Sequence, residues 1–168
     1  MNNTVQSFRN THIRPVDPKD FAFIRSLAAE LPTFTVPSEY ILWFFTHFHP
    51  DYCRVLENQS GELKAYLLSM PTSAPPNSIA IWQVAASVPN RGFALEYFAA
   101  YLREIAGRTG TRSILFTTTL DPGSLRLIRL LSKQFFSCEV SQLDPVPTGQ
   151  GEFEFTISLG LTSTRCPE

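Results

Sequence analysis

Apolar residues recur at three- and four-residue spacing in four stretches of the chain, which is the period of an amphipathic helix. Residues typical of a helix start stand at the head of three of these stretches, at Asp17-Pro18, Ser38 and Asp121-Pro122, and the remaining stretch opens with Arg91-Gly92. The second stretch is apolar nearly all round, so we expect it to be largely covered. The predicted stripes are Phe21, Ile24, Leu27, Ala28 and Leu31; Ile41, Leu42, Phe44, Phe45 and Phe48; Leu95, Phe98, Ala99, Leu102, Ile105 and Ala106; and Leu125, Ile128, Leu131 and Phe135.

Runs of apolar and β-branched residues between these helices predict strands. The turn residues Asn58 to Gly61 join two such runs into a predicted hairpin, and we expect Gly107 and Gly110 to end the third helix. The expected order is strand, two helices, three strands, helix, strand, helix and two strands. The strands are predicted at residues 11–14, 52–57, 63–70, 78–86, 113–118, 137–143 and 152–159.

Length and composition indicate one compact domain. The chain has 168 residues, of which 43% are hydrophobic, enough for a core of two or three layers. We expect a single domain over residues 1–168, with residues 1–10 and 160–168 as loose tails. The odd number of cysteines, with no close pairing, favours reduced thiols.

The charge balance argues against several classes of partner. A net charge of -1 lacks the basic excess typical of proteins that bind nucleic acid or an anionic membrane. No apolar run reaches the roughly 18 residues of a membrane span, and no basic-then-apolar leader begins the chain. We therefore expect a cytoplasmic protein that binds neither nucleic acid nor membrane.

The most informative segment runs from Ile81 to Ala94, where an apolar strand passes into a helix that opens Arg91-Gly92-Phe93-Ala94. The first turn of a helix has unpaired N–H groups at the positive end of the helix dipole. Small residues in that turn let an anion approach the backbone. The junction therefore predicts a phosphate site.

The same segment resembles the GNAT superfamily of acyl-CoA N-acetyltransferases, most closely the ectoine-pathway diaminobutyrate acetyltransferases. The resemblance rests on Trp82 to Ala85, Arg91 to Glu96 and Thr118 to Pro122, supported by His47-Phe48 and by Glu152 with the three residues after it, and spans residues 11–159. It implies an α/β (α+β) GNAT fold, with a central twisted mixed β-sheet of about seven strands and about four flanking helices. It also implies that the sheet is splayed between strands 4 and 5, where the pantetheine arm of the cofactor enters.

The resemblance implies an acetyl-CoA-dependent N-acetyltransferase that acts on a small primary amine by direct transfer in a ternary complex. The resemblance implies no metal cofactor, and it makes a homodimer plausible. The alternative is a degenerate GNAT domain that binds acyl-CoA or a protein partner without catalysis. By resemblance, the cofactor contacts are the backbone of Val84 and Ala86, the pyrophosphate loop at Arg91, Gly92, Phe93 and Ala94, and Ser124 in the fourth helix.

Two positions of the pyrophosphate loop depart from the superfamily pattern, and the fourth helix departs too, with Ser124 and Leu131 in place of an asparagine and a tyrosine. Ala94 replaces a glycine, and Glu96 stands where glycine or alanine is usual. A carboxylate about 8 Å from a phosphate, at an effective dielectric of about 20, opposes binding by about 2 kcal/mol. The alternative for Glu96 is a first-turn carboxylate that stabilises the helix dipole.

The acceptor site implied by the resemblance contains Trp82 and Glu152, which we take as the catalytic candidates. Glu152 would accept the ammonium group, directly or through a water, and Trp82 would wall the pocket. The alternatives are a core aromatic for Trp82 and an edge-strand surface charge for Glu152. The loop from Thr33 to Pro37 lacks an acidic residue that the relatives carry, which suggests a more apolar or differently charged amine.

A zinc site is a competing interpretation for His47, His49, Asp51 and Cys53, because residues that alternate along an extended chain share one face. His47 is expected to end a helix and Asp51 to start a strand, so the four side chains need not share a face. No metal is predicted.

Overall fold

The computed structural model describes residues 11–31, 34–73, 76–87, 91–118, 140–145 and 153–158. For residues 91–93, 95, 116–118, 140–145 and 153–158 it describes the backbone alone. The chain divides into two compact units, one of Met1–Pro71 with Ile81–Phe98 and the other of Thr72–Ala80 with Ala99–Glu168. That the chain forms a single domain stays a prediction.

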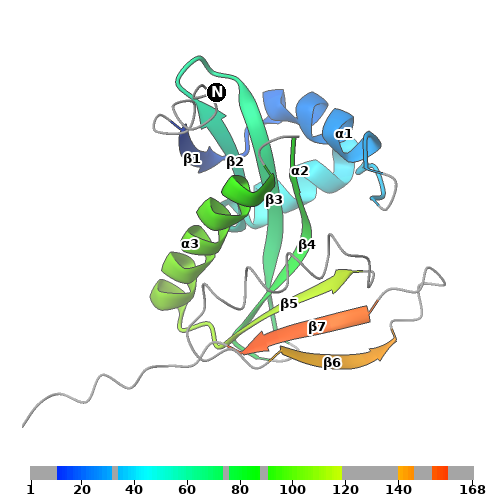
Figure 1. Cartoon of the computed structure of the whole chain (residues 1–168), viewed down its shortest axis with the longest axis vertical. Helices are drawn as coiled ribbons and strands as arrows, with labels where there is room; N and C mark the ends of the chain where they lie inside the picture. Colours follow the sequence, from blue (N-terminus) through cyan, green and yellow to red (C-terminus); the bar gives the residue numbers. More distant parts are fainter. Residues whose placement is uncertain are drawn as a thin grey trace, which may run out of the picture. The chain divides into compact units, whose positions relative to one another are not determined.

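The first unit is built on a meander of antiparallel strands (Figure 1). β1 (Thr11–Pro15) pairs with β2 (Cys53–Asn58), which pairs with β3 (Leu63–Thr72), and β4 (Ser78–Ala86) follows in the strand order. The side chain of Asn58 accepts hydrogen bonds from the N–H groups of Ser60 and Glu62, and Gly61 has a φ of +80°. The predicted hairpin is thus confirmed, since these residues form its turn.

Two helices connect β1 to β2. α1 (Phe21–Ala29) follows a 3₁₀ turn, η2 (Pro18–Asp20), that Asp17 caps. α2 (Glu39–Phe48) is capped by Ser38, whose hydroxyl accepts from the Ile41 N–H at 3.2 Å. Both predicted caps are confirmed. A second 3₁₀ turn, η3 (Pro50–Tyr52), precedes β2, so the expectation that Asp51 starts a strand is wrong.

In the second unit the strand order continues from the start of β4 through β5 (Ser113–Thr118) and β7 (Phe153–Ser158) to β6 (Val140–Pro145). β7 is antiparallel to both β5 and β6. β4 and β5 are neighbours joined through α3 (Arg91–Thr109), the kind of crossover that parallel strands require, so the sheet is mixed as expected. The helix expected from Asp121 lies outside the described residues.

Helix α3 ends one turn later than its first glycine suggests. Gly107 lies within the helix, and Gly110, with a φ of +68°, follows the last helical residue. The Thr111 N–H donates to the Ala106 carbonyl at 3.1 Å, the bond that closes a Schellman motif. The expectation for Gly107 is therefore wrong, whereas Gly110 terminates the helix.

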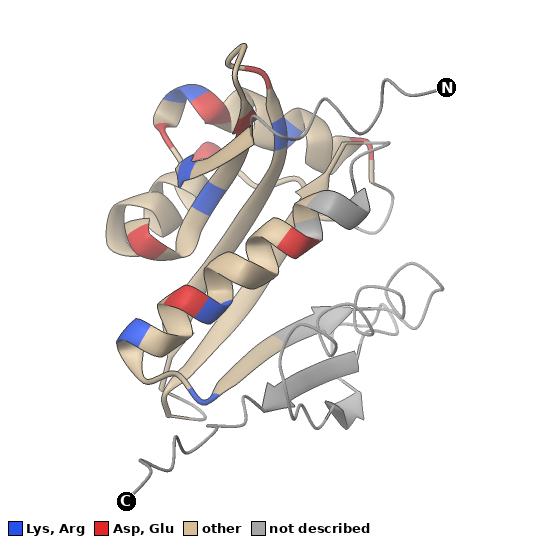
Figure 2. Cartoon of the chain, turned by 60° about the vertical axis from the view of Figure 1, so that its left-hand side comes forward, with Lys and Arg blue, Asp and Glu red and all other residues tan. Residues whose placement is uncertain are grey.

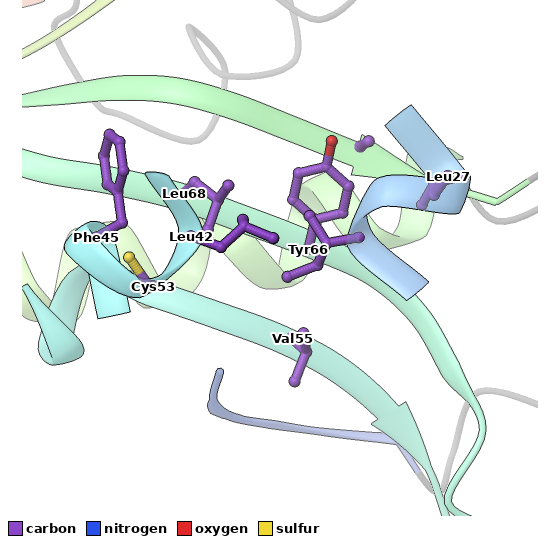
Figure 3. Close-up of a cluster of buried hydrophobic side chains, with 9 residues drawn as sticks. Leu27, Leu42, Phe45, Cys53, Val55, Tyr66 and Leu68 are labelled. Atoms are coloured by element: carbon purple, nitrogen blue, oxygen red, sulfur yellow. The ribbon is translucent and has the colours of Figure 1, made fainter. Parts of the chain in front are cut away.

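The core of the first unit lies between α1 and α2 on one side and β2, β3 and β4 on the other. Figure 3 shows helix side chains meeting strand side chains in this core. Full burial of each large apolar side chain is worth about 1.5–3 kcal/mol, so this cluster anchors both helices to the strands. Its members are Ile24, Leu27, Leu42, Phe45, Cys53, Val55, Tyr66, Leu68 and Ala85.

Helix α2 is less covered than the sequence predicts. Only Leu42 and Phe45 of this helix are buried, whereas Trp43, Phe44 and Phe48 are exposed. The prediction of a largely covered helix is wrong because the layer of strands contacts a single stripe of it.

Charged residues of both signs are scattered over the described elements and do not gather on one of them (Figure 2). Among the helices that the structure describes, none has the length and apolar character needed to cross a bilayer.

A polar contact ties β1 to η2, where Arg14 donates to both carboxylate oxygens of buried Asp20 at 2.6 and 2.9 Å. This pairing raises the pKa of the Arg14 guanidinium.

Candidate functional site

Strand β4 alternates between buried and accessible residues across the predicted motif. Ile81, Gln83 and Ala85 are buried, whereas Trp82 is 38% exposed and Val84 is half-buried. The Trp82 ring stacks on Phe45 of α2, with ring centroids 5.0 Å apart and an interplanar angle of 14°. Trp82 is therefore neither a core aromatic nor a free surface residue. One face is supported by the core, and part of the ring is accessible.

The side chain of Gln83 ties the α1–α2 connection to the strands. Its amide nitrogen donates to the Thr35 carbonyl at 2.7 Å, and its amide oxygen accepts from the Tyr66 hydroxyl at 3.1 Å. Gln83 and Tyr66 are buried, and burial raises the pKa of Tyr66, so the phenol stays a donor. These bonds hold the α1–α2 connection against β3 and β4.

The carboxyl end of β4 is tied to β3 just beyond the strand. The N–H of Ser87 donates to the Lys64 carbonyl of β3 at 2.9 Å, and the Ser87 hydroxyl donates to the same oxygen at 3.1 Å. That the main-chain groups of Val84 and Ala86 contact the acyl group and pantetheine stays a prediction. The Ala86 side chain is buried and leaves the backbone as the usable group.

Helix α3 begins at Arg91, as the sequence predicts, and Gly92 lies in its first turn. Ala94 is 1% exposed, so its methyl group packs into the protein and does not face a ligand. Glu96 is exposed. It lies in the second turn of α3, since the helix begins at Arg91 and its first turn contains no acidic residue. The interpretation of Glu96 as a first-turn carboxylate is therefore wrong.

Several predicted site residues lie beyond what the structure describes. Glu152 and Ser124 fall outside the described residues, and for Arg91 and Phe93 only the backbone is described. Their roles stay predictions. The structure brings Trp82, Val84 and Ala86 onto one strand and Gly92 and Ala94 onto the helix that follows it.

The alternative zinc residues are separated by the local structure. His47 lies on α2, His49 follows it, Asp51 lies in η3, and Cys53 is buried in β2. The Cys53 thiol donates to the Ser69 carbonyl at 3.7 Å, and desolvation raises its pKa to about 11. Within the described part of the chain no three His, Cys, Asp or Glu side chains are grouped to hold a metal ion.

Phe45, Tyr66 and Gln83 were not among the predicted site residues, yet they support Trp82 and the neighbouring loop. The sequence offered one signal, since Gln83 is the polar member of an otherwise apolar alternation in β4. A buried amide needs partners, and a polar residue at a core position therefore points to a specific hydrogen-bonded contact. The partners themselves were not visible in the sequence.

Comparisons of the sequence find no match among family models or curated proteins. Solved structures do match. A diaminobutyrate acetyltransferase from Paenibacillus lautus, solved with its substrate L-2,4-diaminobutyric acid and coenzyme A, has a TM-score of 0.71 at 19% identity, over 89% of this chain and 95% of that one. A chimera that includes the Vibrio cholerae spermidine N-acetyltransferase has a TM-score of 0.64 at 16% identity, over 89% and 95% of the two chains.

A GNAT-family acetyltransferase from Bacillus anthracis is similar to the same extent. Its TM-score is 0.63 at 13% identity, with 89% of this chain and 93% of that one covered. Identities this low carry information on fold and not on substrate, so the closer likeness to the ectoine branch stays a prediction. The chain has the mixed sheet, the flanking helices and the overall fold of the GNAT N-acetyltransferases.

Proposed function

We propose that this protein is an acetyl-CoA-dependent N-acetyltransferase that acts on a small primary amine by direct transfer in a ternary complex. The observation that carries the proposal is the β4–α3 segment, in which Trp82 is accessible, the end of β4 is tied to β3, and a long helix begins at Arg91. The GNAT fold supports this assignment, because the sequence motif of the superfamily falls on this segment.

A CoA diphosphate would bind at the start of α3. Of the two departures in the pyrophosphate loop, Ala94 is buried, and Glu96 is solvent-exposed in the second turn. The Ala94 methyl group therefore does not occupy the approach to the first-turn N–H groups, which would hold the phosphates. Solvent screening lowers the repulsion from Glu96 below the value for a fixed, unscreened pair.

The protein's own groups would orient the reactants and stabilise charge. Acetyl-CoA would supply a thioester whose acetyl group passes to the amine nitrogen, while the released CoA sulfur takes up the proton that the nitrogen loses. Main-chain N–H groups of β4 would donate to the carbonyl oxygen as it gains negative charge. Trp82 would wall the acceptor site, and Glu152 would accept a proton from the ammonium, directly or through a water.

A non-catalytic domain that binds acyl-CoA or a protein partner is the competing function. A thiol-release assay with acetyl-CoA and a panel of diamines, amino acids and arylalkylamines, run beside calorimetric titration with CoA, separates the two. Amine-dependent thiol release supports the transferase. CoA binding without thiol release would identify the non-catalytic domain, and the absence of both would reject either function.

The role of Glu152 has its own test. Glu152→Gln keeps the side-chain size and removes the base, so kcat/KM for the amine should fall about tenfold or more. An unchanged value would remove Glu152 from the mechanism. Glu154→Gln is the matched control, because it makes the same chemical change two residues later in the chain, at a position that is not in the predicted site.

A further inference from the structure

Helix α2 presents exposed aromatic rings at helical spacing. Trp43, Phe44 and Phe48 are 44%, 36% and 54% exposed, and His47 is also exposed. His47 stacks on Trp43 with ring centroids 4.9 Å apart, and Phe48 contacts both of these rings. We call Trp43, Phe44, His47 and Phe48 the α2 aromatic face. So many accessible rings on one short helix are unusual for a solvated surface.

Ring contacts connect the α2 aromatic face to the candidate acceptor site. Trp82 stacks on Phe45, whose ring lies 6.2 Å from that of Phe44 in an edge contact. The Phe44 ring in turn lies 5.1 Å from Phe48. Phe45 is buried, so the path runs through one core ring and has accessible ends at Trp82 on β4 and at Phe44 and Phe48 on α2.

The α2 aromatic face contains no carboxylate to pair with a second ammonium group. Residues 40–50 contain no Asp, Glu, Lys or Arg. Glu39, one residue earlier, lies 3.3 Å from Arg25 in an ion pair. This surface therefore offers the distal ammonium of a diamine only cation–π contacts.

We infer that the acceptor is an amine carried on an aromatic body, which packs against Trp82 and the α2 aromatic face. The inference rests on the proposed acetyltransferase function and names the substrate class of the same site. Aromatic rings in offset or edge contact attract one another beyond the burial of their apolar area, which favours such a body over an alkyl chain of equal length.

The first test is acceptor selectivity of the full-length protein. Tryptamine, n-butylamine and putrescine are compared as acceptors at saturating acetyl-CoA. We expect kcat/KM for tryptamine to exceed that for putrescine by about tenfold or more, because apolar contacts of this size discriminate to that extent. A preference for putrescine would overturn the inference while leaving the transferase function intact. No thiol release with any amine would overturn both.

Variants of the exposed rings locate the selectivity. Phe44→Ser and Phe48→Ser should each lower the tryptamine-to-putrescine ratio of kcat/KM by about three- to tenfold. Phe48→Glu should lower it further, since it adds a partner for the distal ammonium of putrescine. The exposed Glu104→Gln, on α3, is the control and should change the ratio by less than about twofold. Equal ratios in all four variants would overturn the inference.

A second copy of the chain is the other candidate occupant of the α2 aromatic face. Sedimentation of the wild-type protein and of Phe48→Ser distinguishes it. If Phe48→Ser converts a dimer to a monomer and leaves the selectivity ratio unchanged, the surface is a dimer interface and the inference is wrong. If the ratio falls with no change in mass, the acceptor assignment is supported.

Discussion

Trp82 and Ala94 lie on consecutive elements of the candidate site and are supported in different ways. Around Trp82 the geometry depends on specific side chains, because Phe45 supports the ring and Gln83 joins Thr35 to Tyr66. Around Ala94 the usable groups are those of the backbone at the start of α3, and the side chain is buried out of the way. We call the proposed acceptor site around Trp82 the acceptor end and the proposed phosphate site at the start of α3 the phosphate end. Amine binding at the acceptor end should therefore be sensitive to side-chain identity. CoA binding at the phosphate end should be sensitive mainly to charge and to access to the backbone.

The largest expected effect tests the phosphate end. Gly92→Glu places a carboxylate in the first turn, where a negative charge stabilises the helix but opposes a diphosphate. At about 5 Å and an effective dielectric of about 20 the repulsion is about 3 kcal/mol, so the Kd for CoA should rise about a hundredfold or more. Gly92→Gln controls for size. Equal calorimetric affinities of the two variants would place the diphosphate elsewhere.

The next effect tests the acceptor end. Gln83→Leu removes both hydrogen bonds of the buried amide and should lower the free energy of unfolding by about 1–3 kcal/mol in urea titrations. Because the 34–38 segment loses its tether, KM for the amine should rise several-fold while KM for acetyl-CoA changes less. Tyr66→Phe keeps the bond to Thr35 and is the control. Parallel changes in both KM values would contradict the distinction between the two ends.

A smaller effect concerns the core beneath α2, where burial raises the pKa of Cys53 to about 11 from an ordinary value of 9.0. The folded state keeps the proton that the unfolded chain loses, so stability is full below pH 9.0 and falls as the pH rises toward about 11. At about pH 10 the loss should be about 1.4 kcal/mol.

Urea titrations of the wild-type protein and of Cys53→Ala between pH 8 and pH 10.5, at about half-unit steps, measure this loss. The wild-type free energy of unfolding should fall more steeply with pH than that of the variant. Parallel curves would show that Cys53 is not desolvated in the native protein, and would weaken the picture of a packed support beneath Phe45.

The smallest effect concerns Glu96. Its exposed carboxylate is screened by solvent, so Glu96→Gln should tighten CoA binding by less than about threefold at physiological salt. Calorimetry at low and moderate salt measures the change, with Glu104→Gln on the later part of α3 as the control. A gain of thirtyfold would mean that Glu96 faces the phosphates and that the phosphate end also depends on side-chain orientation.

Secondary structure was largely predictable because it depends on local periodicity and caps. The caps at Asp17 and Ser38, the Asn58 turn and the start of α3 at Arg91 all lie where the sequence places them. The errors occurred where one residue had two possible roles. Gly107 is tolerated within a helix, and Asp51 follows a proline that begins a 3₁₀ turn and not a strand.

The candidate site was predictable only in its backbone part. A strand leading to a small-residue helix start is a sequential feature, so the pattern from Trp82 to Ala94 is visible without a structure. The partners of Trp82 and Gln83 lie 37 and 48 residues away in the chain, in α2 and in the segment before it. No periodicity links such distant positions.

The sequence by itself determined which of the described segments become helices and strands, because secondary structure follows from neighbouring residues, and the anion site that it predicts at the start of α3 stays a prediction. Only the tertiary structure decided which stripe of α2 is covered. Its apolar residues surround the whole helix, yet the strands contact the side that contains Leu42 and Phe45 and leave Trp43, Phe44 and Phe48 accessible. Burial depends on what packs against a residue, and that partner comes from a distant part of the chain.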